Sequence, residues 1–220
     1  IPSLDKPKRI LLVLVHPCGL DSFNGACANS ALKGLQAAGH DVRCKTLYGA
    51  TTTTQNKELQ FGSPIILSPV LTSHEKRNYS SLAQNEEYLQ PEVLEVINDL
   101  KWAQALVLVY PTWWMNVPST LKGLFERCFL QHVAFDVDSQ GLKPLLTNIE
   151  KMGVVTTYGA PPHVVFAAGD NGRRMLGSAI RPLFHPSCSL DWTGLYSIDT
   201  TTMKERTDFL LKVEEVYKRF

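Results

Sequence analysis

The continuous apolar run "RILLVLV" (Arg9–Val15) constrains the fold more than any other stretch of the chain. A strand with one wet face alternates apolar and polar residues, whereas an unbroken run is typical of a strand buried on both faces. "AQALVLVY" (Ala103–Tyr110) and "MGVVTTYG" (Met152–Gly159) are two further candidate strands. Strands of this kind occur in parallel sheets that helices cover on both sides.

Helical patterns separate the candidate strands. Ala28, Ala31, Leu32 and Leu35 form an apolar stripe, and Gly39 can end that helix. The predicted strands cover residues 9–15, 41–48, 103–110, 152–159 and 189–198, and the predicted helices cover 23–38, 118–129, 171–184 and 203–219, with one more starting at Pro91. Five strand–helix alternations predict an α/β fold, a doubly wound sandwich with a five-stranded parallel sheet.

We expect one domain over residues 1–220, because no internal linker marks a boundary. Residues 49–90 carry turn and loop chemistry and are too long for a plain loop, so they predict a lid or a dimer arm. The net charge of +1 excludes the basic field that nucleic acids require. Five cysteines without metal-ligand spacing, and no apolar run long enough to span a membrane, favour a cytoplasmic protein without a metal site.

In a doubly wound fold, ligands bind beyond the carboxyl ends of the strands, so we expect the binding residues in the segments that directly follow the strands. "HPCGLDSFNGA" follows the first strand. Asp21 or Ser22 can cap a helix there, and the N–H groups of Ser22, Phe23 and Asn24 can bind a phosphate. His16 could donate to a phosphate oxygen. The alternative is that Ser22 only caps and that His16 is an ordinary loop histidine.

The chain has neither a P-loop nor a Gly-x-Gly-x-x-Gly fingerprint. A phosphate site would therefore use hydroxyl and amide donors without a lysine and Mg²⁺, which argues against hydrolysis of nucleoside triphosphates.

"YPTWWMNVP" follows the third strand, and its two prolines stiffen the loop. A flat ring system could contact Trp114 and Met115 and accept hydrogen bonds from the backbone of residues 112–115. We expect one of the two adjacent tryptophans to pack in the core instead. After the fourth strand, residues 156–159 could donate further amide hydrogen bonds. A phosphate group near Ser22 and a flat ring near Trp114 together describe a flavin nucleotide.

The chain resembles the flavodoxin-fold NAD(P)H:quinone oxidoreductases of the DT-diaphorase and modulator-of-drug-activity type. The marks are "VHP…SFN", "GHDV…LY", "YPxWWxxVPxxLKGxxER" and "TTYG". The resemblance implies that the phosphate is held by His16, Ser22, Phe23 and Asn24. It implies that the flavin ring is contacted by Pro111, Thr112, Trp113, Trp114, Met115, Thr156, Thr157, Tyr158 and Gly159.

Two features depart from that family. Phe135 and Val137 stand where the diaphorase type has tyrosines on a loop that reaches into the partner's pocket, which would remove hydroxyl contacts to the substrate. The diaphorase type also has a tyrosine and a histidine after the "TTYG" stretch, which are proposed to relay charge during hydride transfer. This sequence has no such pair at the matching positions. Tyr158 and His163 are the candidates left for an acid–base role.

The resemblance implies a homodimer that transfers a hydride from NADH or NADPH through the flavin to a quinone, by a ping-pong route. FAD is favoured over FMN, because residues 49–90 could cover an adenosine. Alternatives are an FMN-dependent azo or flavin reductase, and a flavin-binding regulatory subunit of a potassium efflux system. An electron-carrier flavodoxin is disfavoured by the near-neutral charge and the long insertion.

Overall fold

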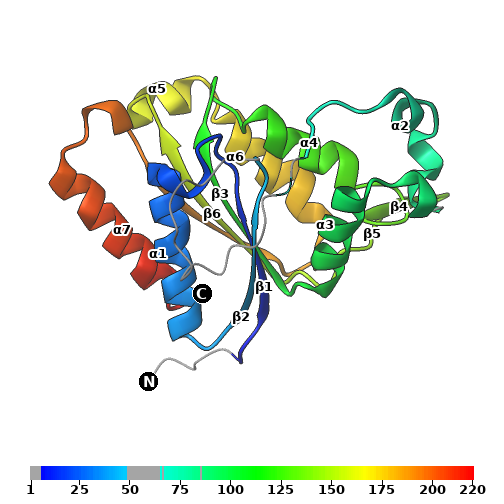
Figure 1. Ribbon diagram of the computed structural model, residues 1–220, viewed down its shortest axis with the longest axis horizontal. Helices are drawn as coiled ribbons and strands as arrows, with labels where there is room; N and C mark the ends of the chain where they lie inside the picture. The colour runs from blue at the N-terminus through cyan, green and yellow to red at the C-terminus, as the bar shows by residue number, and fades with distance from the viewer. Residues whose placement is uncertain (1–5, 49–64, 66, 85) are drawn as a thin grey trace.

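The computed structural model describes residues 6–48, 65, 67–84 and 86–220. A sheet of five parallel strands runs through its centre in the order β2-β1-β3-β6-β7 (Figure 1). The strands are β1 (Arg9–Leu14), β2 (Asp41–Thr46), β3 (Ala105–Thr112), β6 (Lys151–Tyr158) and β7 (Ser189–Leu195). The predicted doubly wound α/β fold is confirmed, and its strands differ from the predicted ones only near their ends.

Helices cover both faces of the sheet (Figure 1). On one face α1 (Phe23–Ala37) packs against α7 (Met203–Tyr217), and α3 (Pro91–Trp102) and α4 (Ser119–Cys128) lie on the other. Within β1, Leu12 belongs to the core beneath α1 and α7, whereas its neighbours Leu11 and Val13 belong to the core on the opposite face. The unbroken apolar run therefore fills two cores at once, as its sequence predicts.

The predicted helix over residues 171–184 is present from Asn171 to Leu183, but it is not a regular α-helix throughout. It is divided into α6 (Asn171–Met175), a π-helical turn η4 (Leu176–Ile180) and a 3₁₀ turn η5 (Arg181–Leu183). Asp170, which precedes it, has a left-handed backbone with φ 40°. A π turn has no hydrophobic period of its own, so the sequence does not reveal it.

The long segment after β2 contains more regular structure than its loop-like sequence predicts. Residues 49–64, 66 and 85 lie outside the described part of the chain, and the lid or dimer-arm prediction falls partly on them. Beyond them the chain forms α2 (Ser73–Arg77), which opens with a capping box between Thr72 and Glu75. Two 3₁₀ turns follow, η2 (Tyr79–Gln84) and η3 (Glu86–Tyr88).

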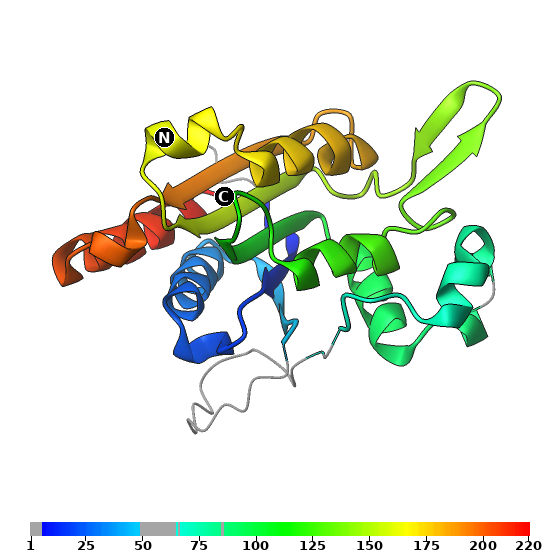
Figure 2. The ribbon, with the colours of Figure 1, turned by 90° about the horizontal axis from the view of Figure 1, so that it is seen from above.

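Two more elements were not predicted. An antiparallel hairpin of β4 (Phe135–Asp138) and β5 (Gly141–Pro144) projects well beyond the sheet (Figure 2). The loop expected after β6 contains a short helix, α5 (Pro162–Ala167). The short turns η1 (Gly19–Asp21) and η6 (Ile198–Thr200) complete the described structure.

A buried ion pair holds the segment after β2 against α4. Arg127 of α4 donates through Nε (3.0 Å) and Nη2 (2.8 Å) to Oε1 of Glu75, and both residues are buried. Its guanidinium also donates to the carbonyl of Ser68 (3.1 Å) and to the amide oxygen of Gln90 (2.6 Å). The arginine of the "LKGLFER" stretch therefore fixes both ends of residues 68–90 to the domain.

We expect Arg127→Met to lower the free energy of unfolding by about 3–5 kcal/mol, because Glu75 would stay buried without its partner. Urea unfolding followed by circular dichroism measures this loss. The control is Lys122→Met, which removes an exposed pair with Glu126 on the same helix and should cost at most about 0.5 kcal/mol.

The difference between wild type and Arg127→Met should depend on pH. Burial alone would raise the pKa of Glu75, but hydrogen bonds from Thr72 and Arg127 outweigh burial and lower this pKa below 4.5. A carboxylate with a lowered pKa stabilises the fold above its unfolded pKa, and this stabilisation is lost as the pH falls through the folded value. The two unfolding free energies should thus converge in acid, and a constant gap would contradict the ion pair's role.

Candidate functional site

The carboxyl ends of β1, β3 and β6 lie side by side at one edge of the sheet. Strand β3 pairs with β1 as far as Leu14 and Val109, and with β6 as far as Thr112 and Tyr158. The strand order reverses between β1 and β3, which is the switch point where doubly wound folds bind ligands. The three segments singled out in the sequence are therefore brought together.

The first of these segments places several hydrogen-bond donors at the start of α1. The Ser22 hydroxyl accepts from the N–H of Gly25 (2.9 Å) and donates to the carbonyl of Gly19 (2.7 Å), so it serves as the helix cap. Asn24 is buried, and its Oδ1 accepts from the Thr157 hydroxyl (3.2 Å), whereas its Nδ2 is buried without a partner among the described residues. An unpaired buried amide is costly unless a ligand accepts from it.

His16 presents another neutral donor on this side of the sheet. Its Nδ1 accepts from the N–H of Cys18 (3.1 Å), which leaves the proton of the neutral ring on Nε2. Burial lowers the pKa of His16, so the neutral form is favoured. Its ring lies 6.4 Å from that of Trp113, between the first and second segments.

The second segment forms a strained two-residue turn. Trp113 and Asn116 exchange backbone hydrogen bonds of 3.0 Å each, and between them Trp114 and Met115 have φ of 50° and 56°. Turns with two positive φ values normally contain Asn-Gly, and a larger residue in this region costs about 1–3 kcal/mol. The prediction that one of the two tryptophans packs in the core is wrong, because Trp113 is 42% exposed and Trp114 is 99% exposed.

A cavity of about 230 Å³ lies between the second and third segments. Its lining residues are Thr112, Trp114, Met115, Tyr158, Gly159 and Ala160. The hydroxyls of Thr112 and Thr156, 2.9 Å apart, join the ends of β3 and β6 behind it. Five of the six lining residues were predicted. Ala160 was missed, although it directly follows the "TTYG" stretch.

The hydroxyl of Tyr158 belongs to a separate network. It donates to the carboxylate of Asp170 (3.2 Å) and accepts from Nε1 of Trp192 (3.1 Å), and its ring stacks on that of Tyr196 with centroids 4.5 Å apart. Burial raises the pKa of this phenol, and the charge of Asp170 raises it further. Asp170, Trp192 and Tyr196 carried no signal in the sequence, because their connection to Tyr158 is purely spatial.

Three predicted site residues lie away from this cavity. His163 is exposed on α5, and none of the described hydrogen bonds joins it to Tyr158. Phe135 and Val137 lie on β4, where Val137 faces Leu142 across the hairpin. Val137 and Leu142 are 60% and 57% exposed, so an apolar pair lies on the projecting hairpin.

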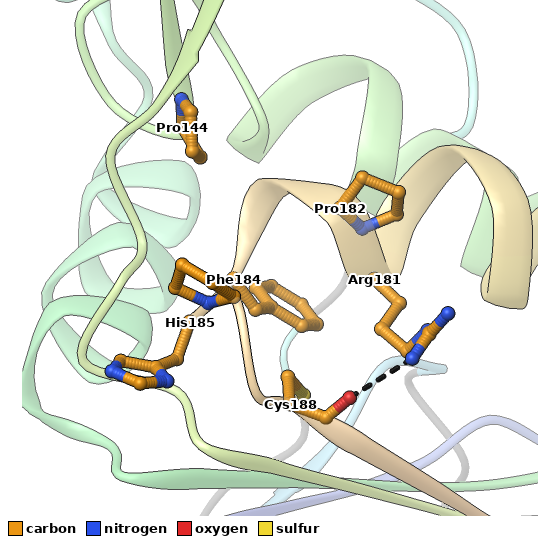
Figure 3. Close-up of a pocket in the computed structure, with 7 residues that line it drawn as sticks. Pro144, Arg181, Pro182, Phe184, His185 and Cys188 are labelled. Atoms are coloured by element: carbon orange, nitrogen blue, oxygen red, sulfur yellow. Dashed lines mark hydrogen bonds between the residues drawn. The ribbon is translucent and has the colours of Figure 1, made fainter.

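A different cavity of about 320 Å³ lies near the amino end of β7 (Figure 3). Its lining residues are Pro144, Arg181, Pro182, Phe184, His185, Pro186 and Cys188. None of these residues lies at the carboxyl end of one of the five parallel strands, so this cavity is not the nucleotide site that the fold class predicts. Within the described ranges no cluster of metal-binding side chains is found, and none of the helices there has the length and apolarity to cross a membrane.

Fold and site together define a doubly wound α/β protein with a candidate ligand pocket at the carboxyl ends of its parallel strands. The chain belongs to the flavodoxin-like fold family, whose model matches residues 8–187. This assignment confirms the family resemblance seen in the motifs.

Relatives with assigned names agree with the family. NAD(P)H dehydrogenase (quinone) 1 of Cavia porcellus is 29% identical over 160 residues, which are 70% of this chain and 54% of that protein. Human ribosyldihydronicotinamide dehydrogenase (quinone) is 28% identical over 156 residues, 69% of this chain and 64% of that protein. The chain thus spans about half to two thirds of the length of these relatives.

Solved structures show the same fold over nearly the whole chain. A Streptococcus mutans protein is 25% identical with a TM-score of 0.77, over 96% of this chain and 100% of that one. The NAD(P)H:quinone oxidoreductase of Methanothermobacter marburgensis is 19% identical with a TM-score of 0.76, over 97% of this chain and 98% of that one. An FMN-dependent NADH-azoreductase of Bacillus anthracis, solved with FMN, is 14% identical with a TM-score of 0.69, over 96% and 98%.

Because the Trp114–Met115 turn is strained, we expect these two residues to lower the free energy of unfolding relative to residues that suit the turn. We expect the double variant Trp114→Asn, Met115→Gly to raise the free energy of unfolding by about 1–2 kcal/mol, because Asn-Gly suits two positive φ values. Chemical denaturation of flavin-free protein measures this change. Leu211→Gly, at an exposed position in α7, is the control. Its free energy of unfolding should fall by about 1 kcal/mol, because glycine is unfavourable inside a helix. A destabilised double variant would contradict the strain.

Proposed function

We propose that this chain carries the flavin site of an NAD(P)H-dependent quinone oxidoreductase. The observation that supports this proposal most directly is the cavity between the ends of β3 and β6, which is lined in part by Trp114 and Met115 of the strained turn. Backbone strain and an exposed indole are features of a binding surface, and both occur here at the carboxyl ends of the strands. The names of the relatives support the same class of reaction.

The phosphate end of the flavin would bind at the start of α1. The free Nδ2 of Asn24, the Nε2–H of His16 and the first-turn N–H groups are all neutral donors. Together with the helix dipole they suit a phosphate without a lysine or a metal ion. Ser22 would act there by fixing the first turn, since its hydroxyl caps the helix and its N–H donates to the carbonyl of Gly19 (3.4 Å).

The flavin ring would lie against the second and third segments. When bound, the flavin supplies the ring that accepts and donates a hydride. Trp114 and Met115 would form an apolar wall that excludes water and orients the substrate, and Thr157, Tyr158 and Gly159 would face the polar edge of the ring. The nicotinamide and the quinone would bind in turn at the same position on the exposed face of the flavin ring. Binding in turn at one position gives ping-pong kinetics.

A homodimer and FAD belong to the same proposal. The exposed pair of Val137 and Leu142 on the projecting hairpin supports docking on a second copy, which would bring Phe135 and Val137 close to the partner's site. The molar mass in solution tests this assembly.

FAD is proposed over FMN because of the long segment after β2, whose later part is held on α4 by Arg127.

Asn24→Asp is the most direct test of the cofactor site. It keeps the acceptor for Thr157 but replaces the unpaired Nδ2 donor with a negative charge, so the Kd for flavin should rise roughly tenfold or more. Fluorescence titration of flavin-free protein with FAD and with FMN measures both constants. Gln36→Glu, at an exposed position near the other end of α1, adds the same charge and is the control. Equal flavin affinity in wild type and Asn24→Asp, or no flavin binding by wild type, would reject the proposal.

Tyr158→Phe separates an acid–base role from a structural one. The Tyr158 hydroxyl is already engaged by Asp170 and Trp192, so we expect kcat for quinone reduction to fall by less than about threefold. The free energy of unfolding should fall by about 1 kcal/mol, because two partners lose a hydrogen bond. A hundredfold loss of kcat, with a changed pH profile, would instead assign the hydroxyl to proton transfer.

A further inference from the structure

A groove lined by three arginines lies beside the edge strand β7. Its volume is about 470 Å³, and Arg173, Arg174 and Arg181 line it together with Asp170, Ser178 and Leu190. We propose that this groove binds a phosphate monoester dianion. Nothing in the family resemblance assigns a ligand to it.

The positive charge of the groove is not neutralised by the protein. None of the three guanidinium groups forms an ion pair with a carboxylate in the described part of the chain. The single acidic residue of the lining is Asp170, which accepts from the Tyr158 hydroxyl. A cluster of one sign in a concave surface concentrates counter-ions of the opposite sign.

Two of the arginines are held by contacts that leave their charge available. Arg181 donates through Nε to the carbonyl of Gly177 (3.3 Å) and through Nη1 to the carbonyl of Cys188 (3.1 Å), the bond drawn in Figure 3. The guanidinium of Arg173 lies 5.5 Å from the centre of the Trp192 ring. Neither arginine uses a carboxylate as its partner in these contacts, so the positive charge of both remains available to an anion.

The irregular helix accounts for the convergence of these side chains. In a regular α-helix Arg173 and Arg181 would differ by about 80° in direction, because eight residues turn through somewhat more than two full turns. The π turn η4 lies between them and has more residues in each turn, which rotates Arg181 back towards the direction of Arg173. π turns are frequent at functional sites, and this one assembles the basic groove.

Phosphate is the anion that fits this donor set. Each guanidinium offers a planar fork of N–H groups that can bind two oxygens of one anion. The guanidinium groups of Arg173 and Arg174, the remaining Nη2 group of Arg181 and the Ser178 hydroxyl offer more donors than a single carboxylate can accept. A phosphate monoester has three terminal oxygens and up to two negative charges.

The groove adjoins the candidate flavin pocket. Tyr158 lines that pocket, and its hydroxyl contacts Asp170, which lines the groove, so one side chain connects the two sites. If the proposed function holds, the 2′-phosphate of NADPH is one source of the dianion. A separate phosphorylated compound is the other source, and the chemistry recognised is the same.

Equilibrium binding to the protein as purified, with any flavin it carries left in place, tests the groove without relying on turnover, because a bound flavin keeps the phosphate probes out of the site at the start of α1. The probes are inorganic phosphate, adenosine 2′,5′-bisphosphate and 5′-AMP, titrated by calorimetry at low ionic strength. We expect the double variant Arg173→Gln, Arg174→Gln to weaken binding of inorganic phosphate and the 2′,5′-bisphosphate by roughly tenfold or more, since each lost fork removes charged hydrogen bonds. Arg181 is left unchanged because it also holds Cys188.

Matched variants keep the result interpretable. Arg219→Gln removes an exposed arginine of the same charge that pairs with Glu215 on α7, and it should bind phosphate as wild type does. Arg173→Lys keeps the charge without the fork and should give an intermediate affinity. Thermal unfolding should show the same transition for all variants. Equal phosphate affinity in wild type and the double variant would overturn the proposal.

Kinetics then separate the two sources. A KM that rises in the double variant for NADPH but not for NADH identifies the coenzyme phosphate. Weaker phosphate binding with an unchanged ratio of the two KM values identifies a separate phosphorylated ligand, and both outcomes support the groove. If the flavin-loaded protein turns over neither coenzyme, the proposed function fails, while the calorimetry still decides whether the groove binds phosphate.

Discussion

The pairing of β3 with β1 on one side and with β6 on the other is the constraint on which the rest of this structure depends. These strands are buried on both faces, so their backbone groups must pair with one another and their side chains must be apolar. Polar and aromatic groups can then appear only where the strands end. Because all three strands run in parallel, their ends bring the donors near Asn24 and the turn at Trp114 to the same edge.

The edge of the sheet tolerates features that its interior could not. Asn24 Nδ2 is buried and unpaired, and Trp114 and Met115 adopt a backbone that suits Asn-Gly. Each feature costs on the order of 1–3 kcal/mol. Two continuous cores above and below the sheet offset that cost, so the unfavourable groups are held in position instead of relaxing. Stability in the interior thereby permits preorganisation at the edge.

The sequence could predict what depends on local pattern and not what depends on distant contacts. The strands and the three segments after them follow from apolar runs and strand order, so most of the cavity lining was found. The turn at Trp114 was misjudged, because its conformation departs from what its residues prefer. Glu75 and Arg127 lie 52 residues apart, and no local pattern relates them. The π turn η4 was hidden because its apolar residues fit an α-helical period equally well.

Tyr158 shows how one residue can belong to two environments of opposite character. A pocket for a flat apolar ring cannot contain unpaired charges, because desolvating them is too costly, whereas a groove that attracts anions needs such charges. Tyr158 lines the apolar pocket, and its hydroxyl reaches Asp170, the only acidic group that lines the arginine groove. Tyrosine suits this position, since its ring is apolar and its hydroxyl is polar. The Tyr158 hydroxyl thus links the end of β6 to Asp170, the residue that precedes the helix bearing the arginines.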